Sequence, residues 1–320
     1  RNLISANGDQ LAASFSRSTT GGSSLFDFSY RVVLNPMNGT VQLRYAPSEY
    51  KITDPAFSAF GIRGNSELFE LSFRQPVIRT PRQELAFSVG FARQTGRTFL
   101  FDNFATPFGI GPESNGTSRT SVFKFGQDYI TRDVQGAWAF RSQFNFGVDF
   151  LGVTNNPSPI PDGQFFSWLG QAQRVQVLNN DQVLIVQADL QLTPDTLLPS
   201  QQFVIGGGQS LRGYRQNARS GDNGFRFSAE NRIVVQRNEA GAAEIQLAPF
   251  IDLGVVWNTS GNPNALRNET FLVGAGAGVI WQPFPGFGLR LDYAVPFIST
   301  TDRGNNVQDS AFYFSVNYQL

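Results

Sequence analysis

The sequence contains no cysteine and no histidine among its 320 residues. Their absence excludes disulfide bonds, thiolate nucleophiles, imidazole bases and the usual zinc ligands, so only unusual Asp/Ser or Asp/Lys chemistry is left for catalysis. We therefore predict that the protein is not an enzyme and that it uses no metal and no cofactor.

Net charge and long apolar runs are lacking as well. The 25 basic residues balance the 25 acidic ones, so no net field attracts nucleic acid or an anionic surface. No apolar run reaches the roughly 18 residues that a membrane-spanning helix needs, and the mean hydropathy is −0.20. If the protein crosses a membrane, it must do so as a β-barrel.

What the chain does contain is 31 phenylalanines and 32 glycines, in segments of about ten residues that alternate between apolar and polar side chains. In one such segment Phe287, Leu289 and Leu291 share a face, while Arg290 and Asp292 share the other. This period is typical of a strand with lipid on one side and water on the other. A soluble β-sandwich is the alternative, but such domains seldom sustain so many long Phe-rich strands. Further apolar faces of this kind are Phe26, Phe28, Tyr30, Val32 and Leu34; Phe140, Phe144, Phe146 and Val148; and Phe312, Phe314, Val316, Tyr318 and Leu320.

Short connections alternate with long ones, as expected when turns lie on the periplasmic side of a barrel and loops lie outside. Counting the segments between them predicts about fourteen antiparallel strands in one barrel domain over residues 1–320. Segment 164–178 breaks the alternation because Arg174 and Gln176 fall in line with Phe166 and Trp168, which suggests a β-bulge. The short connections are 35–39, 81–83, 179–181 and 283–286, and the long ones are 53–65, 101–119, 154–162, 194–224 and 300–310.

One connection of some thirty residues, 194–224, is too long for an idle loop. Its Gly206, Gly207 and Gly208 do not read as a phosphate cradle, because no Lys-Ser/Thr pair, helix pattern or βαβ context follows. The connection contains two glycine-rich motifs, which are Gly207, Gly208, Gln209, Ser210, Leu211, Arg212, Gly213 and Tyr214, and then Gly221, Asp222, Asn223 and Gly224.

These two motifs resemble the sixth-loop signature of the outer-membrane superfamily of polypeptide translocases and insertases. That superfamily includes the TpsB transporters of two-partner secretion (FhaC/ShlB/HecB-like) and the BamA-like assembly proteins. Segments 250–254 and 288–294 also resemble its C-terminal strands, so the resemblance covers at least residues 164–320. It implies a sixteen-stranded barrel in which the loop folds back into the lumen and its arginine pairs with acidic residues of the inner wall.

The alternation supports that implication. It places Asp252 on the inner face of segment 245–257, and it places Gly274, Gly276 and Gly278 together on the inner face of the next segment. Inward glycines weaken a strand, so they suggest that other backbone approaches this wall closely. We predict that the loop approaches there, and that Leu211, Arg212, Gly213 and Tyr214 lock it through a contact of Arg212 with Asp252, with Asp292 as a second partner.

Two features depart from the superfamily. Its members carry N-terminal periplasmic POTRA domains, and their barrels have about two strands more than we count. Segment 1–11 resembles the turn between the second and third strands of those barrels. We therefore expect that the POTRA domains and the first hairpin are missing from this chain.

The resemblance implies an integral protein of the outer membrane of a Gram-negative-type envelope, in contact with lipid and with a client polypeptide. The first hypothesis is a TpsB-type pore that secretes a partner protein without nucleotide hydrolysis, which the second glycine-rich motif favours. The alternatives are a BamA-like insertase and a passive porin. Nucleic acid and small-molecule substrates are not expected. A porin's solute path would be lined by Arg44, Arg74, Arg141, Arg226 and Arg290.

Overall fold

The computed structural model describes residues 8–17, 22–51, 60–101, 103–107, 109–266, 268–301, 303 and 307–318. Most of segment 1–11, which we compared with a family turn, and the C-terminal Leu320 lie outside these residues. Across the described ranges no helix has the length and apolar character needed to cross a membrane.

In the part of the chain that the structure describes, fourteen antiparallel strands form one continuous sheet, each pairing with the next in sequence order, which confirms the expected all-β class and strand number. A short strand, β6 (Phe104–Ala105), extends the edge of β5. The fourteen strands are β1 (Gln10–Arg17), β2 (Ser23–Val33), β3 (Thr40–Lys51), β4 (Arg63–Arg79), β5 (Gln83–Leu100), β7 (Thr117–Asp133), β8 (Gly136–Gly147), β9 (Phe165–Asn179), β10 (Gln182–Leu192), β13 (Asn223–Arg237), β14 (Ala243–Trp257), β15 (Phe271–Trp281), β16 (Phe287–Pro296) and β17 (Phe312–Tyr318).

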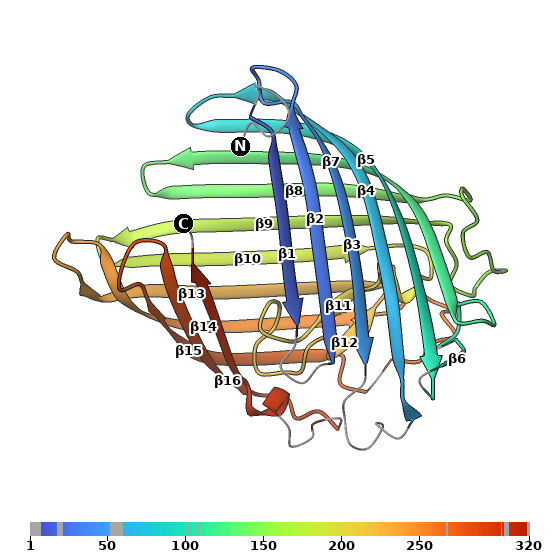
Figure 1. Cartoon of the computed structure of the whole chain (residues 1–320). Helices are drawn as coiled ribbons and strands as arrows, with labels where there is room; N and C mark the ends of the chain where they lie inside the picture. Colours follow the sequence, from blue (N-terminus) through green and yellow to red (C-terminus); the bar gives the residue numbers. More distant parts are fainter. Residues whose placement is uncertain are drawn as a thin grey trace.

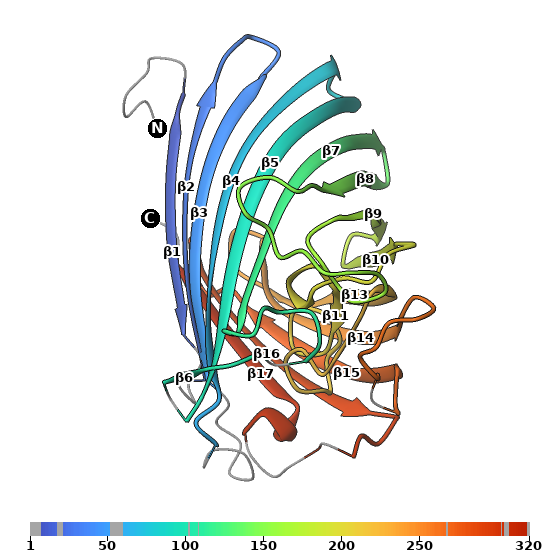
Figure 2. The same cartoon turned by 90° about the vertical axis from the view of Figure 1, so that its right-hand side faces the viewer.

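The sheet curls so strongly that its first and last strands come to the same side of the molecule (Figures 1 and 2). Strands β1 to β5 cross one side, and β13 to β15 cross the side facing them. Within the described residues β1 and β17 have no pairing with each other. The short connections gather at the upper and left end in Figure 1, and the long ones at the lower and right end, as the sequence predicted.

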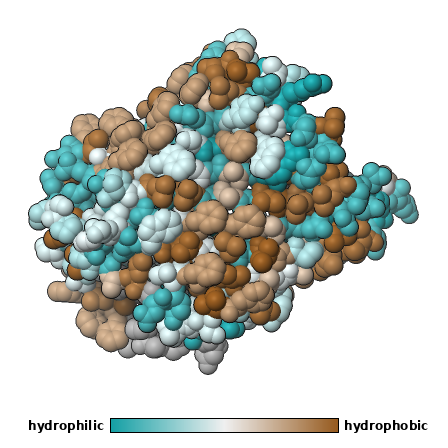
Figure 3. Space-filling view, turned by 180° about the vertical axis from the view of Figure 1, so that it is seen from behind, coloured by the Kyte–Doolittle hydropathy of each residue, from teal (hydrophilic) through white to brown (hydrophobic). Residues whose placement is uncertain are grey.

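The outer face of the sheet is apolar. On β4 the side chains of Phe69 and Leu71 are 45% and 47% exposed, whereas Glu70 between them points inward and binds Lys124 of β7 at 2.5 Å. Figure 3 shows apolar side chains across the middle of one outer face and polar ones toward its two ends. So many exposed apolar side chains would be unfavourable in water, so this surface belongs in hydrocarbon.

The inner face carries the charged residues, mostly as ion pairs. Each arginine that we assigned to a solute path has an acidic partner. The lumen is therefore not lined by free cations at those positions. The pairs are Arg44 with Asp27, Arg74 with Glu84 and Asp128, Arg141 with Asp128, Arg226 with Asp189, and Arg290 with Glu230 and Asp292.

The bulge that we predicted in segment 164–178 is present, but at its last residue, Leu178, and it does not explain the positions of Arg174 and Gln176. The register between β8 and β9 is continuous, and the only shift in β9 lies at its end, around Leu178 beside the turn. Arg174 does share the outer face with Trp168. It is accommodated there because its Nη1 donates to Asp133 at 2.9 Å and its guanidinium lies 5.4 Å from the centre of the Trp138 ring.

Candidate functional site: the lumen loop

The connection between β10 and β13, residues 193–222, lies on the concave side of the curled sheet, and we call it the lumen loop (Figure 2). It contains a short 3-10 helix, η2 (Pro199–Gln201), and two short strands, β11 (Phe203–Ile205) and β12 (Arg219–Gly221), which pair as a hairpin. Some backbone hydrogen-bonding groups of the loop are thus paired within the loop itself. The tip between β11 and β12 is left to contact the wall.

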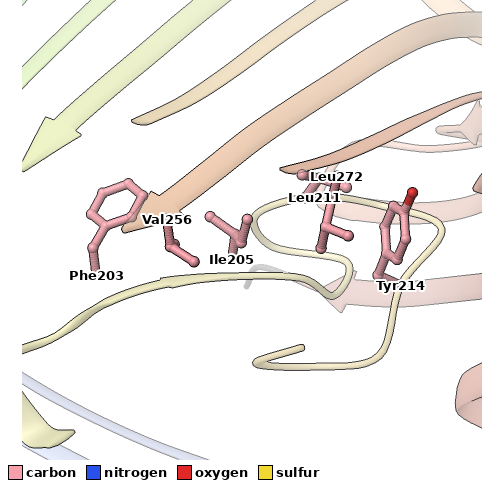
Figure 4. Packing of buried hydrophobic residues seen from close by; sticks show 6 residues of the cluster. All are labelled: Phe203, Ile205, Leu211, Tyr214, Val256 and Leu272. Atoms are coloured by element: carbon pink, nitrogen blue, oxygen red, sulfur yellow. The ribbon is translucent and has the colours of Figure 1, made fainter. Parts of the chain in front are cut away.

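An apolar cluster fastens the tip to the wall (Figure 4). Ile205 and Leu211 of the loop are fully buried, and they pack with Tyr214 against Val256 of β14 and Leu272 of β15. Phe203 completes the cluster at the base of the hairpin. Val256 and Leu272 lie on the inner face of the wall, so the cluster lies between the loop and the wall and not between two sheets. Burial of such side chains stabilises the docked loop by about 1.5 to 3 kcal/mol each.

The tip turns sharply at glycines. Gly206, Gly207 and Gly213 have φ values of 112°, 95° and 100°, a region that other residues rarely adopt. Ser210 braces the turn, since its Oγ donates to the carbonyl of Gly206 at 2.8 Å and accepts from the Gly206 amide at 2.9 Å. Gly208 has a different reason: a Cβ there would lie 2.9 Å from the ring of Tyr313. The tip is therefore held in one shape.

Arg212 lies at the centre of the site. Its Nε and Nη2 donate to the two carboxylate oxygens of Asp252 at 2.7 and 2.9 Å, and its backbone amide donates to the same carboxylate at 3.0 Å. Its Nη1 donates to Glu230 at 2.8 Å. The guanidinium also lies over the Phe250 ring, 3.3 Å from its centre. The second partner that we predicted, Asp292, makes a marginal contact: its Oδ1 lies 4.0 Å from Nη1 of Arg212, at the limit of an ion pair.

Further charges extend this contact into a network. Arg290 of β16 binds Asp292 through Nε at 2.7 Å and Glu230 through Nη2 at 2.7 Å. Arg232 binds the other oxygen of Glu230 at 2.9 Å. The network is balanced, with three cations, Arg212, Arg232 and Arg290, and three anions, Glu230, Asp252 and Asp292.

The charge of Arg212 is almost completely shielded from solvent. Its side chain is 8% exposed, and that of Asp252 is 1% exposed. Burial disfavours the charged guanidinium, but its hydrogen bonds and charge attraction to Asp252 outweigh burial, so the pKa of Arg212 is raised. A buried pair of this kind adds little stability over an apolar contact. Losing one partner, however, leaves an uncompensated buried charge and costs about 3 to 5 kcal/mol.

The two residues after Arg212 make further polar contacts. The Gly213 amide donates to the hydroxyl of Tyr313 at 3.0 Å, and this hydroxyl donates to the carbonyl of Tyr214 at 3.0 Å. The Tyr214 hydroxyl lies 2.8 Å from the Val273 carbonyl, where β15 begins. Arg215 binds Asp309, in the connection between β16 and β17, through two contacts of 2.7 Å. The tip is therefore attached to strands β14 to β17 together.

The three inward glycines of β15 serve different neighbours. A Cβ at Gly274 would collide with the carbonyl oxygen of Arg212, so the loop backbone does approach the wall there. Our expectation was wrong for the other two. A Cβ at Gly276 would collide with the backbone of β16 and crowd the Phe250 ring, and one at Gly278 would collide with the Asp292 carboxylate. These glycines make room for network residues, not for the loop.

The second glycine-rich motif closes the base of the loop. Asp222 is fully buried, and its carboxylate accepts hydrogen bonds from the Leu197 amide at 3.0 Å and from the amide and hydroxyl of Thr259 at 3.0 and 2.8 Å. A Cβ at Gly224 would collide with the Phe203 ring, and one at Gly221 would lie 3.1 Å from β14. Asp222 thus connects the loop base to the neighbouring external loop.

Sequence reasoning placed Arg212 and Asp252 together but missed Glu230 and Phe250. Alternation along β13 does put Arg226, Ser228 and Glu230 on the inner face, and that signal was present. It could not separate Glu230 from any other inner carboxylate. Parity with Asp252 places Phe250 on the inner face as well, but nothing in the sequence marks this apolar side chain as a partner of Arg212.

Comparison with known proteins finds a matching family model and a similar transporter. The family model described as haemolysin secretion/activation protein ShlB/FhaC/HecB matches residues 2–280. The outer membrane transporter CdiB of Dickeya dadantii (strain 3937) is 24% identical over 164 residues, which are 50% of this chain and 28% of the transporter.

Two solved structures share the fold. CdiB from Escherichia coli superposes with a TM-score of 0.75 at 18% identity, covering 99% of this chain and 56% of that one. BamA from Haemophilus ducreyi, in a form lacking POTRA domains 1–3, gives a TM-score of 0.61 at 15% identity, covering 98% and 64%. The chain thus spans only part of the length of the proteins it resembles.

Proposed function

The chain belongs to the haemolysin secretion/activation family ShlB/FhaC/HecB, and on that premise we propose that it is the membrane-spanning pore of a two-partner-secretion transporter. It is an integral outer-membrane protein with the barrel fold of that family. The pore exports a partner polypeptide in extended form through the lumen. The observation that carries this proposal is the lumen loop, held inside the barrel by Arg212 on Asp252 and Glu230.

The geometry suggests how the loop serves transport. Its tip is attached to β14 to β17, and its base contacts the opposite wall, where Gln201 donates to Gln94 at 3.4 Å and to Thr120 at 3.0 Å. A passing chain therefore has the short-turn side of these contacts available, and the loop must move to let it through. Arg212 belongs to a charge-balanced network. If the loop shifts along the wall, Asp252 and Glu230 lose Arg212 and must find other partners. The family match and the absence of any nucleotide-binding motif support transport without catalysis, with free energy supplied by client folding outside.

The test is removal of the gene in its host. We expect one large secreted protein to be lost from the medium while other outer-membrane barrels remain at normal abundance. Re-expression of the wild-type chain within its full-length protein should restore secretion. Persistence of every secreted protein would contradict the proposal.

A BamA-like insertase remains the second candidate, because β1 and β17 are unpaired edges within the described residues and an exposed edge can template a new strand. The same deletion separates the two, since an insertase deletion would deplete many barrels at once. The passive porin is disfavoured by the ion pairs on its expected arginines and by the loop in the lumen.

A further inference from the structure

Five arginines gather at the short-turn end of the inner wall, far from the lumen loop. They come from three strands, β4, β7 and β8, and from the turn between β4 and β5. In Figure 2 these strands lie across the curled sheet from β14 and β15. We call this group the arginine patch, and its members are Arg74, Arg79, Arg82, Arg132 and Arg141.

The patch faces the lumen. On β7, Lys124 and Asp128 point inward, because Lys124 binds Glu70 at 2.5 Å and Asp128 binds Arg74 at 3.3 Å. Alternation along the strand then turns Arg132 to the same side. Arg79 reaches the inner Glu84 at 3.8 Å. The patch is therefore in contact with water in the pore and not with lipid.

Arg82 and Arg132 form a like-charge pair across two strands. The Arg132 amide donates to the Arg82 carbonyl at 2.7 Å, which continues the register of β5 and β7 by one residue and sets the two arginines directly opposite each other. Like charges in this position destabilise a sheet. Both side chains are exposed, and neither has an acidic partner within the part of the chain that the structure describes. A ligand that binds both would offset this cost.

Acids do not balance the patch. Glu84 is shared by Arg74 and Arg79, and Asp128 is shared by Arg74 and Arg141. Two carboxylates thus bind three of the five arginines, and five positive charges minus two negative ones leave a local charge of +3. The next acid along the wall, Glu70, is already bound by Lys124. This differs from the lumen-loop network, where cations and anions are equal in number.

A hollow beside the patch offers room for an extended chain. A cavity of about 370 Å³ has Arg74, Asp128, Arg141, Gln171, Gln187 and Asp189 among its lining residues, and Asp189 is bound by Arg226. Glutamine side chains can donate to and accept from a peptide backbone, and arginine forks bind carboxylates in pairs. The wall therefore combines backbone-binding groups with cationic ones.

We propose that the arginine patch is the entry surface for an acidic segment of the exported polypeptide, which it holds in extended form through carboxylate contacts with Arg82 and Arg132. This inference rests on the proposed transport function and names the class of segment that the pore accepts first. Capture at the periplasmic rim would bring the client onto the inner wall between this rim and the lumen loop.

The test uses the full-length protein in nanodiscs and a fluorescent Glu-Ser repeat peptide, with a Lys-Ser repeat of equal length as the charge control. We expect the acidic peptide to bind and the basic one not to. Arg82→Gln with Arg132→Gln should weaken binding about tenfold, since two exposed charged contacts are lost. The matched control is Arg237→Gln, which removes an exposed arginine from another turn of the same rim.

Several results would overturn the proposal: equal binding of both peptides, an unchanged affinity in the double variant, or an equal loss with Arg237→Gln. Binding of the acidic peptide in phosphatidylcholine nanodiscs that is lost in phosphatidylglycerol nanodiscs would assign the patch to anionic lipid headgroups instead. Removing the like-charge pair should not lower thermal stability, and Arg132→Gln alone repeats the comparison if the double variant does not fold. The peptide assay does not depend on secretion. A deletion strain that secretes normally would refute the transport function, whereas the peptide assay alone tests the arginine patch.

Discussion

Replacing Arg212 by methionine is expected to release the tip of the lumen loop from the barrel wall. Methionine keeps the apolar contact with Phe250 but removes the hydrogen bonds to Asp252 and Glu230. Both carboxylates are less than 10% exposed, so each is left as a buried charge with fewer partners. We expect the docked loop to lose about 3 to 5 kcal/mol.

That loss corresponds to roughly two to four orders of magnitude in the equilibrium between docked and undocked tip. The apolar cluster and the contacts of Tyr214 and Arg215 remain, so the loop should open more often without leaving the lumen for good. Hydrogen exchange of the amides in segment 207–216 measures this directly, because exchange through opening rises by the same factor. Single-channel recordings should show more frequent brief openings.

Two further variants make the experiment decisive. Lys124→Met removes another inner-wall ion pair, with Glu70, and should leave exchange of segment 207–216 unchanged. Combining Arg212→Met with Asp252→Asn should recover part of the loss, since one of the unpaired charges is then gone. If Arg212→Met alone left the amides of this segment as protected as in the wild type, the assignment of Arg212 as the lock would be refuted.

Other substitutions test the surroundings of the lock. Gly274→Ala should displace the loop tip because its Cβ would collide with the Arg212 carbonyl, whereas Gly90→Ala on another part of the inner wall should not; the same exchange measurement checks both. Asp222→Asn should weaken the loop base by about 1 to 3 kcal/mol, because a buried acceptor of several hydrogen bonds is altered, and a lower melting temperature with faster exchange in segment 194–202 would record it. Tyr313→Phe removes two hydrogen bonds to the tip and should cost about 1 kcal/mol each, so unchanged exchange at the tip would count against that contact.

Alternation made much of the fold predictable from the sequence. A strand exposed to lipid on one face and water on the other must repeat every two residues, so Asp252 and Asp292 could be assigned to the inner face without coordinates. The pairing of Arg212 with Asp252 followed from the loop resemblance together with this parity. The structure brings those two side chains to 2.7 Å.

Parity cannot give the remaining partners, because it says which face a side chain takes and not which strands meet across the lumen. Arg290 on β16 binds Glu230 on β13, three strands away in the sheet, and only the curvature of the barrel brings them together. Phe250 was missed because an apolar side chain on the inner face breaks the rule itself. Arg174 was misread for the opposite reason, since Trp138 and Asp133 allow a cation on the outer face.

The two walls of the lumen differ in a way that ionic strength should reveal. At the lumen loop each charge has a buried partner in direct contact, and salt screens such pairs weakly. At the arginine patch the charges are exposed and uncompensated, so attraction of an acidic peptide should fall steeply once the screening length drops from about 10 Å at 0.1 M salt to about 3 Å at 1 M. High salt should therefore release the Glu-Ser peptide while exchange at the tip of the lumen loop stays slow. Loss of loop protection over the same salt range would mean that the lock depends on solvent-accessible charge, contrary to the burial of Arg212 and Asp252.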